Sequence, residues 1–227
     1  MGSFWSSLPT ALHGTVWVVA PETVSLDTID GVQIEADLVR VDSDVARGCM
    51  VIGHPHPLHG GDRHNHVVRS LQVAAAAAGL HSIAVDFRGV GNSGGVHDDG
   101  DSERLDLAAA CELAELVEPD APIILAGYSF GSVVAMNVSH PWIAGWIAVA
   151  PPLPMMGSRP TAASAPRPKI LLAPEHDQFT PPPALRLAVA DWSTTEVILM
   201  PGVDHFIAAD APAWCSTAVA RILQLIG

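Results

Sequence analysis

Residues 122–138 read as a strand, a tight turn and a helix in immediate succession, and this unit restricts the fold more than any other part of the sequence. Residues 122–126 form a short apolar run typical of a buried strand, and residues 132–138 have the composition of a helix. The turn between them reads Gly127-Tyr128-Ser129-Phe130-Gly131 and fits the pattern G-x-S-x-G. A serine on such a strained turn crowds the positions two residues before and after it, so glycine is needed at both. The unit predicts a nucleophilic Ser129 at the edge of a sheet.

The rest of the chain alternates between strands and helices from about residue 48 onward. We predict strands at residues 16–19, 32–41, 48–53, 82–87, 122–126, 146–149, 170–173 and 197–200, and helices at 67–78, 102–117, 132–138, 183–192 and 212–225. This alternation is typical of an α/β fold, with a parallel sheet covered on both faces. We expect one domain over residues 1–227, because 227 residues with 49% hydrophobic content can bury a single large core.

Composition argues against several classes of partner. The chain has 24 acidic and 11 basic residues, and a net charge of −13 disfavours nucleic acid and anionic membrane surfaces. No run approaches the roughly 18 apolar residues of a membrane span, and no basic segment precedes the first apolar run. The three cysteines are widely separated in apolar surroundings, which favours core packing in a reducing compartment. We therefore expect a cytoplasmic protein with a small-molecule partner.

A nucleophilic serine needs a base and an orienting carboxylate, and both follow later strands. Asp177 follows the strand at 170–173, and His205 follows the next strand. Catalytic groups of open α/β sheets gather at the carboxyl ends of strands, and the order Ser, acid, His is the one expected for this type of turn. We predict Ser129, Asp177 and His205 as the catalytic residues. Glu175 is the alternative acid, because it lies near the same strand end.

The oxyanion of an acyl-transfer intermediate needs two hydrogen-bond donors, and the predicted donors are backbone amides. Phe130, directly after the serine, supplies one at the start of the helix. The loop after the strand at 48–53 reads HPHPLHGG from His54 to Gly61. Proline has no amide hydrogen, so His56 is the first donor inside this turn after His54. We predict the amides of Phe130 and His56 as the oxyanion hole.

Two segments are expected to shape the substrate pocket. One is the turn around His59, and the other is the segment 152–168, which is rich in Pro, Ala, Ser and Met and lacks periodicity. It is too short for a cap domain but suits a flap over a site. Met155 and Met156 could line an acyl pocket there, although loop methionines more often pack on the nearest apolar surface.

Two other motifs invite functions that we do not adopt. A zinc site is suggested by the histidines that cluster in one loop region: His54, His56, His59, His64 and His66. Their spacing fits no zinc motif, and a complete Ser-Asp-His triad needs no metal, so we expect neither a metal nor another cofactor. Residues 89–94 match G-x-G-x-x-G, but no helix opens on these glycines, so we predict a tight loop instead of a dinucleotide site.

Four motifs together resemble the α/β-hydrolase superfamily. They are HPHP-x-x-GG at 54–61, D-F-R-G-x-G-x-S-x-G at 86–95, the G-x-S-x-G turn, and D-x-x-x-P at 177–181. In order and spacing they are similar to the compact, cap-less proteins near dienelactone hydrolases, from about residue 48 to the C-terminus. The resemblance implies an α/β-hydrolase fold with a mostly parallel eight-stranded sheet, helices on both faces and no large cap domain. It also implies Ser129, Asp177 and His205 as the triad.

Two departures from that branch bear on the substrate. Dienelactone hydrolases usually carry Cys where this chain has Ser129, and Asp62-Arg63 replaces the small polar and apolar pair expected after the glycines. Our hypothesis is a serine hydrolase that cleaves a small carboxylic ester or thioester through an acyl-enzyme. The alternative is a non-hydrolytic ligand-binding protein or a cyclase on the same fold, because a fold alone does not determine function.

Overall fold

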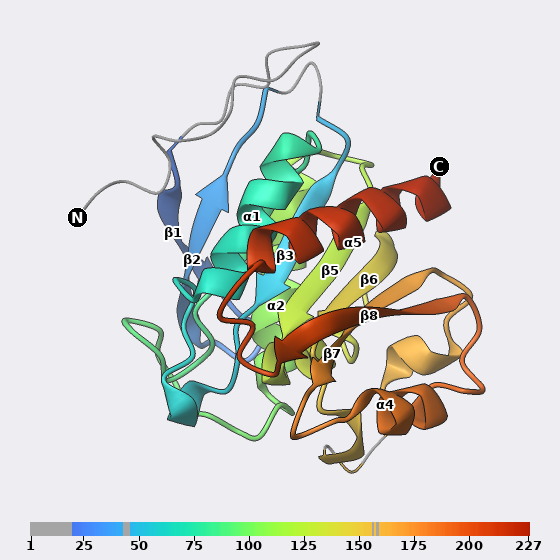
Figure 1. Cartoon of the computed structure of the whole chain (residues 1–227). Helices are drawn as coiled ribbons and strands as arrows, with labels where there is room; N and C mark the ends of the chain where they lie inside the picture. The colour runs from blue at the N-terminus through green and yellow to red at the C-terminus, as the bar shows by residue number, and fades with distance from the viewer. Residues whose placement is uncertain (1–19, 43–45, 156, 158) are drawn as a thin grey trace.

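The computed structural model describes residues 20–42, 46–155, 157 and 159–227. Its centre is an eight-stranded sheet of order β1-β2-β4-β3-β5-β6-β7-β8 (Figure 1). Strand β2 runs antiparallel to both β1 and β4, and the other neighbouring strands are parallel. The sheet is therefore mixed but mostly parallel, and the predicted α/β architecture is confirmed.

The elements follow the expected alternation along the chain. The strands are β1 (Glu22–Asp27), β2 (Gln33–Val39), β3 (Cys49–Gly53), β4 (His81–Val85), β5 (Ile123–Tyr128), β6 (Ile143–Val149), β7 (Lys169–His176) and β8 (Thr195–Asp204). The α-helices are α1 (His66–Ala77), α2 (Glu103–Val117), α3 (Phe130–Ala135), α4 (Pro182–Ala188) and α5 (Ala211–Ile226). Among the described residues, no helix is both long and apolar enough to cross a membrane.

Helices cover both faces of the sheet. Helices α1 and α5 pack side by side on one face, while α2, α3 and α4 pack against the other (Figure 1). Successive side chains of a strand point to opposite faces. In β3, Met50 and Ile52 accordingly join the core beneath α1 and α5, and Cys49 and Val51 join the core beneath α2 and α3. Burial on both faces explains why the central strands are almost continuously apolar.

The sequence-based boundaries differ from the structure at both ends of the sheet. Strand β1 is absent from the predicted set, because it lies on the sheet edge, is only partly buried, and has four polar or charged residues and only two apolar ones. The predicted strand at 16–19 lies outside the described residues. Strands β7 and β8 extend beyond the predicted ranges. Helix α3 begins at Phe130, the residue expected at its start, but it ends at Ala135 and not at residue 138.

The predicted flap, residues 152–168, contains two short 3₁₀ helices, Leu153–Met155 and Thr161–Ser164. The second of these helices is anchored to the end of α3 by two hydrogen bonds to Met136. Thr161 Oγ1 donates to the Met136 carbonyl at 3.0 Å, and the Ala162 amide donates to the same oxygen at 2.9 Å. This part of the segment is thus fastened to the core.

Candidate active site

The predicted site residues lie where the parallel strands end. Ser129 follows β5, Asp177 follows β7, His205 follows β8, and His56 lies in the loop after β3. Parallel strands place their carboxyl ends at one edge of the sheet, so residues more than 100 positions apart come together there.

Ser129 has a backbone conformation that its flanking glycines make possible. Its φ of 51° and ψ of −122° lie in a region that non-glycine residues rarely adopt. A Cβ on Gly127 would lie 2.4 Å from the backbone carbon of Gly131. A Cβ on Gly131 would lie 2.3 Å from the carbonyl oxygen of His54. Glycine at both positions therefore lets the turn close and brings the loop after β3 directly against it.

The side chains of Ser129, His205 and Asp177 form a continuous hydrogen-bonded chain. Ser129 Oγ lies 3.0 Å from His205 Nε2, and His205 Nδ1 lies 2.9 Å from Asp177 Oδ2. The other carboxylate oxygen of Asp177 accepts the amides of Phe179 and Thr180 at 2.8 and 2.9 Å. Because an ionised carboxylate only accepts, His205 carries its proton on Nδ1 and its Nε2 faces the serine hydroxyl. The arrangement can remove the proton of Ser129.

Tyr128, between the glycine and the serine of the turn, anchors the histidine from behind. Its hydroxyl donates a 2.7 Å hydrogen bond to the His205 carbonyl. Burial, followed by the charges of Asp177 and Asp204, raises the pKa of Tyr128 well above its usual value, so the hydroxyl keeps its proton. Tyr128, the first variable position of the G-x-S-x-G pattern, therefore helps to hold His205 in place, and the sequence analysis does not identify this contact.

The two acidic neighbours of the proposed triad point elsewhere. Glu175, the alternative acid, is 45% exposed and accepts the Gly202 amide through Oε2 at 2.7 Å. Asp204 accepts the amides of Phe206 and Ile207 at 3.0 and 3.2 Å within its own turn. Asp177 is the carboxylate that the structure brings to His205.

The loop after β3 packs on the serine turn through aromatic rings. The ring centroids of His56 and Phe130, the two predicted oxyanion donors, lie 5.0 Å apart. The adjacent His54 is fully buried, and its Nε2 accepts the Phe87 amide at 3.1 Å while its Nδ1 lies 2.6 Å from the Pro55 carbonyl. Burial lowers the pKa of His54 to about 4. His54 is therefore a neutral structural residue that holds the β3 and β4 loops together.

A buried arginine secures the same loop, and no sequence motif predicts its contacts. Arg63 pairs with Asp86, which follows β4, and its backbone amide donates to the same carboxylate at 2.8 Å. Its guanidinium also contacts Asp37 at 3.0 Å and Glu35 at 3.2 Å, both on β2. The unusual Asp62-Arg63 pair therefore has a structural role in joining three segments.

The five histidines considered for zinc do not converge on one point. His54 is used as described above, His64 contacts Arg69, and His66 Nε2 lies 3.1 Å from the Ile207 carbonyl. The His59 ring centroid lies 4.9 Å from that of His56. The five histidines therefore do not form one zinc site, in agreement with their sequence spacing, which fits no zinc motif.

The residues predicted to line the substrate pocket are exposed or lie outside the described part of the chain. His59 is exposed in the loop after β3, Met155 is 62% exposed, and Met156 lies outside the described residues. Two residues that were not predicted border the site more closely. The rings of Phe179 and Phe206 lie 4.6 and 5.9 Å from the His205 ring and are 44% and 56% exposed. Each is a near neighbour in sequence of a predicted triad residue, which could have identified them.

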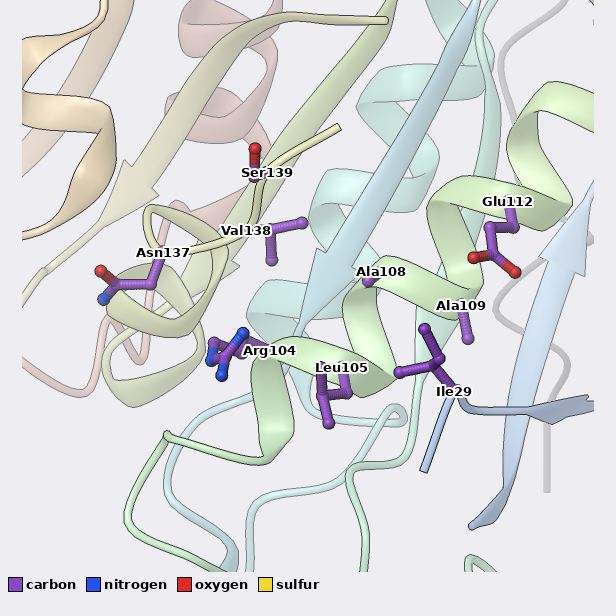
Figure 2. Close-up of a pocket in the computed structure, with 9 residues that line it drawn as sticks. All are labelled: Ile29, Arg104, Leu105, Ala108, Ala109, Glu112, Asn137, Val138 and Ser139. Atoms are coloured by element: carbon purple, nitrogen blue, oxygen red, sulfur yellow. The ribbon is translucent and has the colours of Figure 1, made fainter. Parts of the chain in front are cut away.

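Two concavities lie on the side of α2 and α3. The first, of ≈ 210 Å³, lies between α2, Ile29 and the residues after α3 (Figure 2). The second, of ≈ 440 Å³, is lined by residues of 99–104, α3 and Thr161. Neither lining contains Ser129, Asp177 or His205, so the triad is not at the base of either one.

Comparison with known proteins identifies the family. The family model described as serine aminopeptidase S33 matches residues 54–207. The chain belongs to this family. The match begins in the histidine-rich loop and ends two residues after His205, so it spans every residue predicted for the triad and the oxyanion hole.

Solved structures of similar proteins agree with this family. An α/β serine hydrolase homologue from Coxiella burnetii has a TM-score of 0.81 at 29% identity, with 90% of this chain and 99% of that chain covered. An α/β serine hydrolase without a lid from Xanthomonas campestris has a TM-score of 0.77 at 24% identity, with 93% and 97% covered, and shares the fold. The prediction of a cap-less α/β hydrolase is confirmed.

A monoacylglycerol lipase of Mycolicibacterium smegmatis is 36% identical over 118 residues, which are 50% of this chain and 40% of the lipase. The chain spans about half the length of the curated relatives it matches.

Proposed function

We propose that the protein is a serine hydrolase that cleaves small carboxylic esters or thioesters through an acyl-enzyme on Ser129. The observation that carries the proposal is the chain from Ser129 Oγ through His205 to Asp177, with separations of 3.0 and 2.9 Å. Both distances lie within hydrogen-bond reach, which is what proton transfer from a nucleophile requires.

In the proposed reaction, Ser129 Oγ attacks the carbonyl carbon while His205 Nε2 takes the hydroxyl proton. Asp177 holds the imidazole in the required tautomer and stabilises the imidazolium. The amides of Phe130 and His56 bind the oxyanion of the tetrahedral intermediate. His205 then gives its proton to the leaving alcohol or thiol, and water releases the acid from Ser129 by the same steps in reverse order.

The rim of the site favours an apolar substrate group. Phe179 and Phe206 present exposed ring surface beside His205, and exposed aromatic surface next to a reactive group is suited to apolar contacts. The monoacylglycerol lipase among the relatives acts on an ester, which supports this substrate class. We also propose a cytoplasmic location, which is supported by three free, buried thiols.

The test is labelling with a fluorophosphonate together with turnover of p-nitrophenyl esters and thioesters of graded acyl length. Ser129→Ala should abolish labelling and lower kcat by about 10⁴ to 10⁶ without loss of fold, because alanine fits the turn but has no hydroxyl. The matched control is Ser139→Ala, a serine outside the proposed machinery, which should label as the parent does.

Activity of Ser129→Ala within tenfold of the parent would remove Ser129 from the mechanism. If the parent neither reacts with the probe nor turns over any substrate of the panel, the non-hydrolytic alternative, a ligand-binding protein or cyclase, is favoured instead.

A further inference from the structure

Three possible metal ligands come together next to the predicted oxyanion loop. They are His56 in the loop after β3, and His97 and Asp99 in the loop between β4 and α2. One ligand atom from each lies within 4.8 Å of the other two. The His97 ring also packs on Phe130, with centroids 5.4 Å apart, so the cluster borders the residue that follows Ser129.

The hydrogen bonds of His97 determine which of its nitrogens is free. Glu103 is fully buried, and its carboxylate accepts the amides of Asp98 and Gly100 at 2.8 and 2.9 Å. The same carboxylate lies 2.6 Å from His97 Nδ1. Because His97 Nδ1 is directed at this carboxylate, Nε2 is the ring nitrogen that is available to bind a metal ion. A carboxylate behind a ligating histidine is the usual support of a protein-bound metal.

The Nε2 atom of His97 faces a carboxylate oxygen of Asp99. His97 Nε2 is buried and has no hydrogen-bond partner among the described residues. It nevertheless lies 3.3 Å from Asp99 Oδ1. A proton on the imidazole or a metal ion between the two atoms makes this contact favourable. Two ligand atoms bound at about 2.0 Å to a tetrahedral Zn²⁺ are themselves about 3.3 Å apart, which is the separation seen here.

We propose that His56, His97 and Asp99 form a binding site for a zinc-like divalent transition-metal ion. A set of two imidazoles and one carboxylate suits Zn²⁺ better than the hard cations Mg²⁺ and Ca²⁺, because the hard cations prefer oxygen ligands. His56 supplies the third ligand of the set. A tetrahedral ion with three protein ligands has a fourth position for water.

Metal binding at this site affects the oxyanion loop through His56. At present His56 Nδ1 accepts the Leu58 amide at 3.2 Å and so caps the short turn after it. Coordination through Nδ1 exchanges this hydrogen bond for the metal and joins the β3 loop to the β4 loop. The site goes beyond the proposed ester hydrolysis, in which the metal takes no part.

The test is calorimetric titration of the full chain, first stripped with EDTA, with ZnCl₂. We expect one Zn²⁺ per chain in the parent. Asp99→Asn should weaken the affinity at least about tenfold, as should His97→Gln. Asp99 is 98% exposed, so its substitution leaves the fold intact even if His97→Gln does not. The matched control is His176→Gln, whose side chain is 65% exposed and lies outside the cluster.

A second readout is the visible absorption of Co²⁺ substituted for Zn²⁺, which should be that of a low-symmetry nitrogen and oxygen site in the parent and be lost in Asp99→Asn. The proposal is overturned if the parent binds no Zn²⁺, if Asp99→Asn and His97→Gln bind as tightly as the parent, or if His176→Gln weakens binding equally. These outcomes are independent of ester turnover.

Discussion

Two groups of loops meet at the active-site edge of the sheet, and they are held in different ways. The loops after β5, β7 and β8 carry Ser129, Asp177 and His205, and they are fixed by hydrogen bonds to nearby backbone groups. The loops after β3 and β4 are fixed by buried charges, with Arg63 on Asp86 and Arg88 on Asp106. The first group therefore carries the proposed chemistry, and the second group is a scaffold that presents amides and packing surface to it.

The scaffold group depends on compensation between opposite charges. Burial raises the pKa of Asp106, and the hydrogen bonds from Arg88 lower it in part. Arg88 also holds Asp30 on the β1–β2 turn, and its hydrogen bond is the main cause that lowers the pKa of Asp30 to about 2. Removal of one partner from such a buried pair leaves a charge without compensation, which is more costly than the loss of a surface pair.

The largest effect is expected in the triad group. Asp177→Asn should keep the fold but favour the wrong tautomer of His205, so kcat should fall by about 10⁴. Glu175→Gln is the matched control from the same strand end, and it should cost little because Glu175 contacts the Gly202 amide and not His205. Both variants are measured with one activated ester, and circular dichroism checks that they are folded.

A large loss of kcat in Glu175→Gln together with a nearly unchanged kcat in Asp177→Asn would mean that the acid is misassigned. If neither substitution changes kcat, the Ser-His-Asp mechanism itself is wrong. The loops after β5, β7 and β8 would then not differ in function from the loops after β3 and β4.

The two groups also differ in how far the sequence predicts them. Gly127 and Gly131 are predictable because a strained serine turn excludes Cβ atoms within a five-residue segment. Asp177 and His205 follow from strand order, since each comes directly after a strand that ends at the same edge. The fold class follows from the alternation of strands and helices alone.

The scaffold group is less predictable because its contacts join distant residues. Arg63 and Asp86 are 23 positions apart, and their pairing depends on the backbone path of two irregular loops. His97 and Glu103 are close in sequence, but their contact depends on the turn between them. Arg63, Asp86 and His97 all lie in irregular loops without a fixed periodicity, so no pattern in the sequence indicates their partners.

The next largest effect concerns stability in the scaffold group. Arg63→Met should lower the free energy of unfolding by about 3–5 kcal/mol, because it leaves the buried carboxylate of Asp86 without its arginine partner and removes one of the two arginines that contact Asp37. The matched control is Arg221→Met, whose partner Glu196 lies 2.7 Å away on the surface, and it should cost less than about 1 kcal/mol. Chemical denaturation at neutral pH measures both values, and equal losses would show that the two pairs do not differ as their burial implies.

A somewhat smaller effect should appear when the pH is lowered. The pKa of His54 is lowered by burial from 6.5 to about 4, so the unfolded chain binds a proton before the folded protein does. The stability that depends on neutral His54 is fully present above about pH 6.5, the unfolded pKa. It is lost progressively as the pH falls from there through the folded pKa of about 4. Between pH 7 and pH 4 this loss amounts to about 3 kcal/mol.

The measurement compares the parent with His54→Asn, which retains an acceptor for the Phe87 amide but does not titrate. The parent should lose about 3 kcal/mol more stability than the variant over this range, because other carboxyl groups titrate in both proteins. Parallel curves would show that His54 is not kept neutral by its surroundings.

The smallest effect is expected from removal of metal, and it tests whether the histidine-rich loop is scaffold or chemistry. Ester turnover should survive dialysis against EDTA within about twofold, because no step of the proposed reaction uses a Lewis acid. The same treatment would empty the proposed site at His56, His97 and Asp99. An unchanged kcat in a protein that still rebinds Zn²⁺ would show that metal binding and ester hydrolysis are independent. If chelation abolishes turnover and Zn²⁺ restores it, the β3 and β4 loops take part in the reaction, and the division between a chemical group and a scaffold group of loops no longer holds. Such a result in Asp99→Asn as well as the parent would place the essential metal elsewhere than at this cluster.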